Sequence, residues 1–211
     1  ICDADEVNLK RAKDMYGIDG TSDYRQVLEN PNVDALLILT PPHTHRQIIE
    51  DGFSAGKHIF CEKPIAQNLA DAIAIVDCAK KSDRHCQVAF QERFNVGFRN
   101  MREIVQSGQL GSIELICVYG RLSRKNLTHS WMNDSQKGGG TLLESAVHSF
   151  DITRWITGNN YERVYAETQI KGDKSKYEET LIAVGRLNGG TIANIDATWG
   201  LPNGALFDSR V

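Results

Sequence analysis

The feature that most constrains the fold is a change of pattern along the chain. Up to about residue 106, short apolar runs alternate with longer amphipathic segments, which is typical of a parallel sheet with crossover helices. After Gly111 the apolar runs lengthen and alternate with polar residues, which is typical of an antiparallel sheet. We therefore expect an α/β protein, with an incomplete parallel-sheet domain over residues 1–92 and an α+β domain with an open antiparallel sheet over residues 93–211.

The positions of the elements follow from the same pattern. The predicted strands of the first domain are 35–39, 58–61 and 87–90, and those of the second are 113–119, 163–170, 181–187 and 191–198. The predicted helices are 5–16, 44–55, 69–82, 95–107 and 141–156. The run 35–39 is apolar without alternation, so we expect a strand covered on both faces. Asn188-Gly189-Gly190 predicts a hairpin.

Composition excludes several classes of protein. The net charge of −3 gives no positive field for a nucleic-acid backbone, so we expect no nucleic-acid partner. The longest apolar run, 35–39, is far shorter than the ~20 residues of a membrane-spanning helix, so we expect no membrane partner. Five scattered cysteines without a CxxC pair favour reduced thiols in the cytoplasm over a disulfide framework or a zinc site. The chain starts at Ile1 inside what reads as a strand, so we treat it as a fragment.

Two strand-to-helix junctions carry unusual residues. Ligands bind at the carboxyl ends of strands in an open α/β sheet, so these junctions are candidate binding sites. The first is Thr40-Pro41-Pro42-His43-Thr44-His45, for which a stiff turn with solvated histidines is the alternative. The second is Glu62-Lys63-Pro64, for which a surface ion pair is the alternative.

A third junction lies at the start of the chain. Asp3 follows a possible strand end, where an acid in dinucleotide-binding folds accepts hydrogen bonds from ribose hydroxyls and favours NAD over NADP. The glycine-rich phosphate loop would lie upstream of Ile1, since no GxGxxG occurs in the chain. The alternative for Asp3 is a simple helix N-cap.

The second domain offers a Gly138-Gly139-Gly140 run before the predicted helix 141–156. Steps of 100° per residue put Leu142 on an apolar face, and Glu144, His148 and Asp151 on the other. We expect Glu144 to orient His148 and to raise its pKa, as a general acid/base requires. The alternatives are a solvated polar face and a metal site, and we expect no metal because no HExxH or cysteine cluster completes one. Trp131 and Trp199 are read as pocket or core residues, and Arg121, Arg124 and Lys125 as a solvated strand end.

Four sequence blocks, in order, resemble the glucose-fructose oxidoreductase/inositol dehydrogenase/MocA-like family of oxidoreductases. They are Thr40–His45, the AGKHIFCEKP segment Ala55–Pro64, Glu92–Asn95 with Ser107–Gly111, and Gly138–Glu144 leading to His148 and Asp151. The resemblance implies a Rossmann domain for NAD(P), here partial at its N-terminus, followed by an α+β domain, also partial, for substrate binding and oligomerisation. It further implies hydride transfer between a sugar or cyclic polyol carbon and the nicotinamide.

The resemblance also implies roles for individual residues. Lys63 matches the catalytic lysine, which contacts both the cofactor and the substrate, and His148 matches the acid/base. Glu144 lies where many members have Asp, as an orienting or substrate-binding carboxylate. The cofactor-contacting positions are Asp3, Thr40, Pro41, His45, Glu62 and Lys63. Arg93, Trp131 and the stretch 121–126 are further candidates for substrate binding.

We therefore predict an NAD-dependent dehydrogenase of CH-OH groups, with NAD favoured over NADP by Asp3. Its partners are a small sugar or polyol and further copies of the chain, in a dimer or tetramer. One alternative is a catalytically silent regulator or scaffold that keeps the dinucleotide fold. Another is a cofactor-retaining oxidoreductase or an NADP-dependent reductase of sugar derivatives or diketones.

Overall fold

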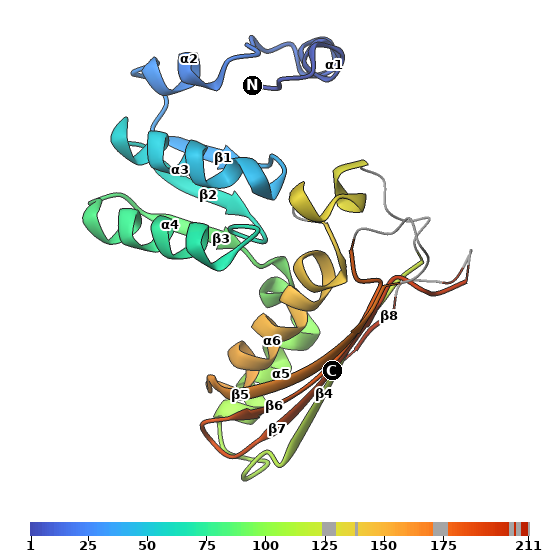
Figure 1. Ribbon diagram of the computed structural model, residues 1–211. Coiled ribbons are helices and arrows are strands. Elements are labelled where there is room, and N and C mark those ends of the chain that lie inside the picture. Colours follow the sequence, from blue (N-terminus) through green and yellow to red (C-terminus); the bar gives the residue numbers. More distant parts are fainter. Residues whose placement is uncertain (124–129, 138, 171–176, 203–204, 206–207, 211) are drawn as a thin grey trace. The chain divides into compact units, whose positions relative to one another are not determined.

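The computed structural model describes residues 1–123, 130–137, 139–170, 177–202, 205 and 208–210 (Figure 1). Its residues group into two compact units. The first comprises Ile1–Thr40, Thr44–Glu62 and Asn68–Val88. The second comprises Pro41–His43, Lys63–Gln67 and Ala89–Val211.

The first unit is built on a three-stranded sheet in the order β1-β2-β3. Its elements are α1 (Glu6–Tyr16), α2 (Tyr24–Glu29), β1 (Ala35–Ile38), α3 (His45–Ser54), β2 (His58–Glu62), α4 (Leu69–Lys81) and β3 (Cys86–Ala89). β1 and β2 are parallel, with Ile38 opposite Cys61. This arrangement confirms the predicted Rossmann-type parallel sheet. The short helix α2 was not predicted.

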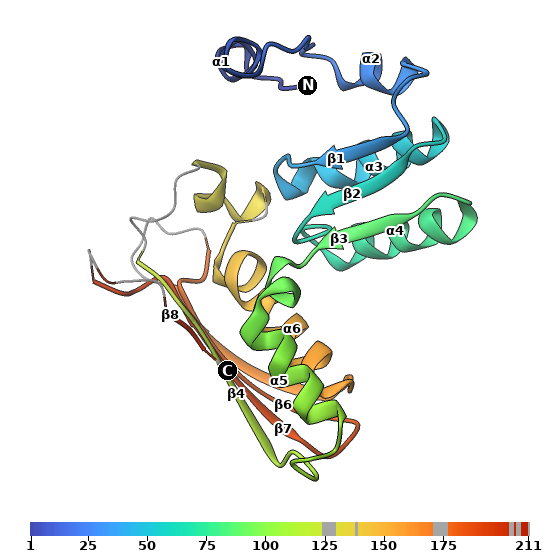
Figure 2. The ribbon, with the colours of Figure 1, turned by 180° about the vertical axis from the view of Figure 1, so that it is seen from behind.

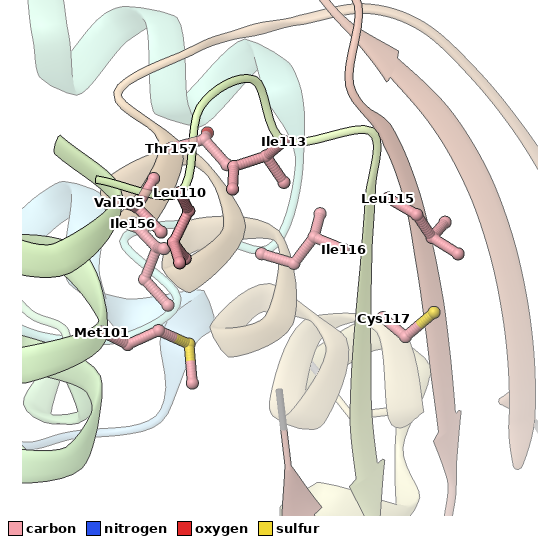
Figure 3. Close-up of a pocket in the computed structure, with 9 residues that line it drawn as sticks. All are labelled: Met101, Val105, Leu110, Ile113, Leu115, Ile116, Cys117, Ile156 and Thr157. Atoms are coloured by element: carbon pink, nitrogen blue, oxygen red, sulfur yellow. The ribbon is translucent and has the colours of Figure 1, made fainter. Parts of the chain in front are cut away.

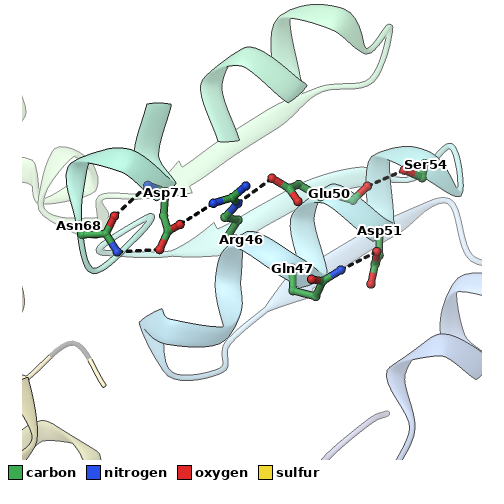
Figure 4. A network of polar contacts seen from close by, with 7 residues as sticks. All are labelled: Arg46, Gln47, Glu50, Asp51, Ser54, Asn68 and Asp71. Atoms are coloured by element: carbon green, nitrogen blue, oxygen red, sulfur yellow. Dashed lines mark hydrogen bonds and ion pairs between the residues drawn. The ribbon is translucent and has the colours of Figure 1, made fainter. Parts of the chain in front are cut away.

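Local sequence explains where these helices begin and how they pack. The Asp5 carboxylate accepts hydrogen bonds from the first turn of α1, and the Asn68 side chain caps α4 by accepting from the Asp71 N–H. A Cβ at Gly52 of α3 would lie 2.7 Å from a side-chain carbon of Ile59, so this glycine lets the helix approach the sheet closely. Arg46 of α3 binds Asp71 of α4 and so joins the two helices (Figure 4).

The two faces of this sheet differ. Leu36 and Ile38 are buried beneath the helices, whereas the side chain between them, Leu37, is 69% exposed. The expectation that this strand is covered on both faces is therefore wrong. The reason is that α3 and α4 both lie on the same face of the sheet, as the two opposite views show (Figures 1 and 2).

The second unit contains a five-stranded sheet in the order β5-β6-β7-β4-β8. Its elements are α5 (Val96–Gln106), β4 (Leu115–Arg121), α6 (Val147–Thr157), β5 (Tyr161–Gln169), β6 (Thr180–Leu187), β7 (Ile192–Thr198) and β8 (Asp208–Arg210). The predicted hairpin forms, since β6 and β7 are antiparallel neighbours and Gly190 has a φ of +88°. The sheet is mixed, because β4 pairs with β7 in parallel after the long connection that contains α6.

The core of this unit lies between the sheet and α6. Ile152 and Ile156 of α6 pack with inward-facing side chains such as Leu181 and Ile195, while α5 lies alongside. An apolar pocket of about 210 Å³ lies where α5, α6 and β4 meet (Figure 3). Its lining holds no charged side chain, so we assign no chemistry to it.

Candidate active site

A buried ion pair stands at the centre of the candidate site. Lys63 follows the last residue of β2 and precedes Pro64 through a cis peptide bond. Its ammonium group donates to the Glu144 carboxylate Oε2 at 2.8 Å and to the Glu144 carbonyl oxygen at 3.1 Å. The two side chains are only 13% and 7% exposed, and both residues belong to the second unit. The alternative of a surface ion pair at this junction is therefore wrong.

Glu144 is carried by one turn of π-helix, η6 (Leu142–Ala146), which runs directly into α6. π-turns of this kind occur frequently at functional sites. The glycines before it are needed for steric reasons. A Cβ at Gly139 would lie 2.2 Å from the Met132 carbonyl oxygen, and Gly140 has a φ of +110°.

Contacts from β6 and β7 hold this turn in place. Just before β6, the Glu178 carboxylate accepts a hydrogen bond from the Leu142 N–H at 3.0 Å. At the end of β7, the fully buried Trp199 donates from its indole N–H to the Ser145 hydroxyl at 2.8 Å. Glu178 was missed in the sequence because no motif surrounds it.

The predicted division of residues 141–156 into an apolar and a polar face holds only in part, since Ala146 and Phe150 of the apolar face pack in the core but Leu142 does not. Leu142, expected in the core, is 39% exposed, while Glu144 and Asp151 are buried. The π-turn explains the difference, because its wider i→i+5 hydrogen bonding breaks the 100° spacing on which the division rested. Because Glu144 and Asp151 are buried, the alternative that these carboxylates lie on a solvated face is excluded.

His148 is partly buried. Its ring and the Phe90 ring are nearly perpendicular, with 6.3 Å between ring centroids, and its Nδ1 is buried without a hydrogen-bond partner among the described residues. Burial, and then the positive charge of Lys63, lower the pKa of His148 from 6.5 to about 4. The predicted increase of this pKa by Glu144 is therefore wrong, since the carboxylate is paired with Lys63. His148 is neutral at pH 7.

Asp151, one turn after His148 on α6, binds Arg93. The Arg93 guanidinium donates from Nε to Oδ2 at 2.8 Å and from Nη2 to Oδ1 at 2.5 Å. The Asp151 side chain is only 6% exposed. Hydrogen bonding to Asp151 raises the pKa of Arg93 further, so the guanidinium stays charged.

The expected cofactor residues of the first unit lie at strand ends. His45 is fully buried and its Nε2 lies 2.7 Å from the Thr40 carbonyl oxygen, so this imidazole braces the turn that follows β1. The alternative of a solvated histidine is therefore wrong for His45. The Thr40 hydroxyl lies 2.6 Å from that of Thr44, and Glu62 is the last residue of β2. Pro41 belongs to the second unit.

Asp3 follows an isolated parallel bridge between Cys2 and Thr21 rather than a full strand. Its Oδ1 accepts from the Asp5 N–H at 2.9 Å, ahead of α1. Asp3 itself does not cap α1, because that position belongs to Asp5.

The remaining candidates are scattered over the second unit. Trp131 lies in the short helix η4 (Ser130–Asn133), and Arg121 forms an ion pair with Asp196 of β7. Arg124, Lys125 and Asn126 lie outside the described residues. No group of three or more His, Cys, Asp or Glu side chains placed to hold a metal ion occurs in the described part of the chain. Within that same part, no helix is both long and apolar enough to span a membrane.

Comparison with known proteins covers almost the whole chain. Residues 1–90 match the profile described as oxidoreductase family, NAD-binding Rossmann fold, and residues 98–211 match that of the GFO/IDH/MocA C-terminal domain. Myo-inositol 2-dehydrogenase of Thermotoga maritima is 30% identical over 201 residues, which are 93% of this chain and 59% of that protein. Inositol 2-dehydrogenase of Corynebacterium glutamicum is 27% identical over 189 residues, which are 88% of this chain and 54% of that protein.

Solved structures agree with this result. A probable dehydrogenase from Thermotoga maritima superimposes with a TM-score of 0.87 at 28% identity, over 99% of this chain and 63% of that one. Apo scyllo-inositol dehydrogenase from Lactobacillus casei gives a TM-score of 0.85 at 26% identity, over 99% and 62%. The chain thus spans about three fifths of the length of these relatives.

Proposed function

The chain belongs to the GFO/IDH/MocA family of oxidoreductases, and on this basis we propose that it serves an NAD-dependent dehydrogenase of cyclic polyols or sugars. The substrate class rests on the relatives, which are named as inositol dehydrogenases. The reaction is the transfer of a hydride between a hydroxyl-bearing carbon and the nicotinamide.

One observation carries the proposal. The Lys63–Glu144 pair lies beside a neutral His148, and Glu144 and His148 each have one buried polar atom that is available to a ligand. Glu144 Oε1 and His148 Nδ1 are buried and lack hydrogen-bond partners in the described part of the chain. Buried polar atoms of this kind cost free energy unless a ligand pairs with them. A polyol suits them, because each hydroxyl both donates and accepts a hydrogen bond.

Each of the three side chains has a distinct task in the oxidation direction. Neutral His148 takes the proton of the substrate hydroxyl. Its low pKa leaves the imidazole unprotonated and free to accept at neutral pH, and also makes it a weaker base than an ordinary histidine. Lys63 donates a hydrogen bond to the same oxygen as negative charge develops on it. Glu144 holds the ammonium in place and accepts from a neighbouring hydroxyl. The chemistry that a bound NAD would supply is acceptance of a hydride.

We propose that the dinucleotide is held by Asp3, Thr40, Pro41, His45, Glu62 and Lys63. The geometry of the sheet supports this proposal. β1 and β2 are parallel neighbours, so Thr40 and Glu62 lie at the same edge of the sheet, where the carboxyl ends of the strands meet. The Asp3 carboxylate suits ribose hydroxyls and repels a 2′-phosphate, which favours NAD over NADP. His45 contributes by fixing the Thr40 turn.

We further propose residues 1–92 as the cofactor domain, and residues 93–211 as the domain for substrate binding and oligomerisation. The outward face of the larger sheet supports the second role. Ile182 and Val184 of the interior strand β6, and Tyr165 of the edge strand β5 opposite Val184, are exposed there. A second copy of the chain would cover this face, as open sheets commonly require.

The test is NADH formation by the natural polypeptide that contains this chain, measured by absorbance. The panel comprises inositols, aldoses and sugar derivatives, with NAD and NADP in parallel. We expect turnover of at least one polyol with NAD, lost in Lys63→Met and retained in Lys137→Met, a matched change at an exposed lysine of the same unit. Tight NAD binding without turnover of any member would contradict the proposal and favour the regulator. Tighter binding of NADP than of NAD would contradict the role of Asp3.

A further inference from the structure

The surroundings of His148 form a closed ring of four residues on two elements. The short helix η2 (Gln91–Phe94) joins Phe90 to Arg93, because Phe90 precedes it and the Arg93 N–H donates to the Phe90 carbonyl oxygen at 3.1 Å. Helix α6 joins His148 to Asp151, which lie three residues apart and therefore on neighbouring positions of the helix surface. Two side-chain contacts, Arg93 with Asp151 and Phe90 with His148, close the ring.

The Arg93–Asp151 contact is rigid. Two parallel N–H···O bonds, of 2.8 and 2.5 Å, fix the plane of the guanidinium as well as its position. Asp151 is almost completely buried, so its carboxylate cannot exchange this partner for water. Arg93 is the partly exposed member, with 41% of its side chain accessible.

Arg93 in turn fixes the ring of Phe90. Its Cζ lies 5.4 Å from the Phe90 ring centroid, within the range of a cation–π contact. The Phe90 ring meets the His148 ring at an interplanar angle of 87°, the edge-to-face geometry that aromatic pairs prefer. Phe90 therefore contacts both the Arg93 guanidinium and the His148 imidazole.

We propose that Asp151 and Arg93 are positioning residues, which clamp the Phe90 ring against His148 and keep the imidazole fixed and dry for proton transfer. This inference rests on the acid/base role of His148 proposed above. It assigns Arg93 an action through Phe90 rather than a contact with substrate. The charged groups around His148 are Lys63, Glu144, Arg93 and Asp151, and the test must leave their charges unchanged.

Arg93→Lys and Phe90→Leu meet that condition. The first retains the positive charge but loses the planar two-bond fork, and the second removes the aromatic ring while retaining most of its volume. Arg154→Lys is the matched control, since Arg154 lies on the same helix but binds Asn160 instead. Folding of each variant is checked by its amide spectrum.

The measurement is the pH titration of His148 in this chain by NMR with isotope-labelled histidine, assigned with His148→Gln. In the parent, we expect His148 to titrate near 4. We expect both test variants to raise the midpoint by about one pH unit or more, because water entering beside the ring stabilises the imidazolium. Arg154→Lys should leave it unchanged. An unchanged midpoint in Phe90→Leu, or in Arg93→Lys, overturns the clamp.

Turnover gives an independent readout. A positioning role predicts that Arg93→Lys lowers kcat at unchanged KM, whereas a substrate contact predicts a higher KM. A rise in KM alone overturns the assignment. The titration needs no turnover, so failure of the clamp and failure of the proposed dehydrogenase activity are distinguishable.

Discussion

Replacing Lys63 by Met should destabilise the second unit strongly. The substitution keeps an unbranched side chain but removes the cation that lies 2.8 Å from Glu144 Oε2. The carboxylate, 7% exposed, would then be buried without a compensating charge. Removal of one partner from a buried pair costs about 3–5 kcal/mol, which is a large share of the ~5–15 kcal/mol by which a domain is stable.

The double variant Lys63→Met, Glu144→Leu sharpens this prediction. It removes both charges, so no buried ion remains unpaired. We expect its free energy of unfolding to lie within about 1–2 kcal/mol of the parent, or above it, because apolar replacement of a whole buried pair is often neutral or stabilising. The same pair of changes abolishes the proposed chemistry, so stability and activity should separate in this variant.

Urea unfolding followed by tryptophan fluorescence measures this effect, because all three tryptophans, Trp131, Trp155 and Trp199, lie in the second unit. Lys137→Met is the control. Its ammonium lies 3.9 Å from Asp134, with 52% and 34% of the two side chains exposed, so its loss should cost about 1 kcal/mol or less. Equal losses in Lys63→Met and Lys137→Met, or a double variant as unstable as Lys63→Met, would refute the reasoning.

Three further predictions concern the turn, the histidine and the sheet. Gly140→Ala should lower the free energy of unfolding by roughly 1–3 kcal/mol, because its φ of +110° and the Glu178 carboxylate 2.6 Å from a Cβ exclude a side chain; an unchanged urea midpoint would contradict this. Since the pKa of His148 falls from 6.5 to about 4 on folding, the unfolded state binds the proton more readily, and stability is lost as pH falls from 6.5 to about 4, by up to about 3 kcal/mol. His148→Gln should remove this part of the pH dependence of the urea midpoint. Ile182→Asp, on the outward face of β6, should reduce the molecular mass found by light scattering if a second copy covers that face, and an unchanged oligomer would exclude this surface.

The sequence predicted the elements well because their boundaries are local. Asp5, Gly17 and Asn68 specify helix ends through contacts within a few residues, and the Asn188-Gly189-Gly190 turn specifies its hairpin in the same way. The parallel pairing of β4 with β7 was not predicted, since it depends on which strands meet after a long connection.

The contacts among the candidate site residues could not be predicted from their spacing. Spacing alone placed Glu144 beside His148, yet the carboxylate binds Lys63, which lies 81 positions earlier. The π-turn that redirects Glu144 is stabilised by Glu178 and Trp199 from other parts of the chain, so no periodicity could reveal it. As a result, the pKa of His148 is lowered rather than raised.

The central claim, that Lys63 and His148 promote hydride transfer from a polyol carbon to NAD, is tested most directly by isotope transfer. The substrate found in the panel is deuterated at its hydroxyl-bearing carbon and incubated with NAD and the natural polypeptide, and the nicotinamide product is analysed by mass spectrometry. We predict one deuterium on the nicotinamide, at an equal rate in Lys137→Met and at a rate at least a hundredfold lower in Lys63→Met and His148→Gln. Unlabelled NADH, or equal transfer by the Lys63→Met variant, would contradict the account.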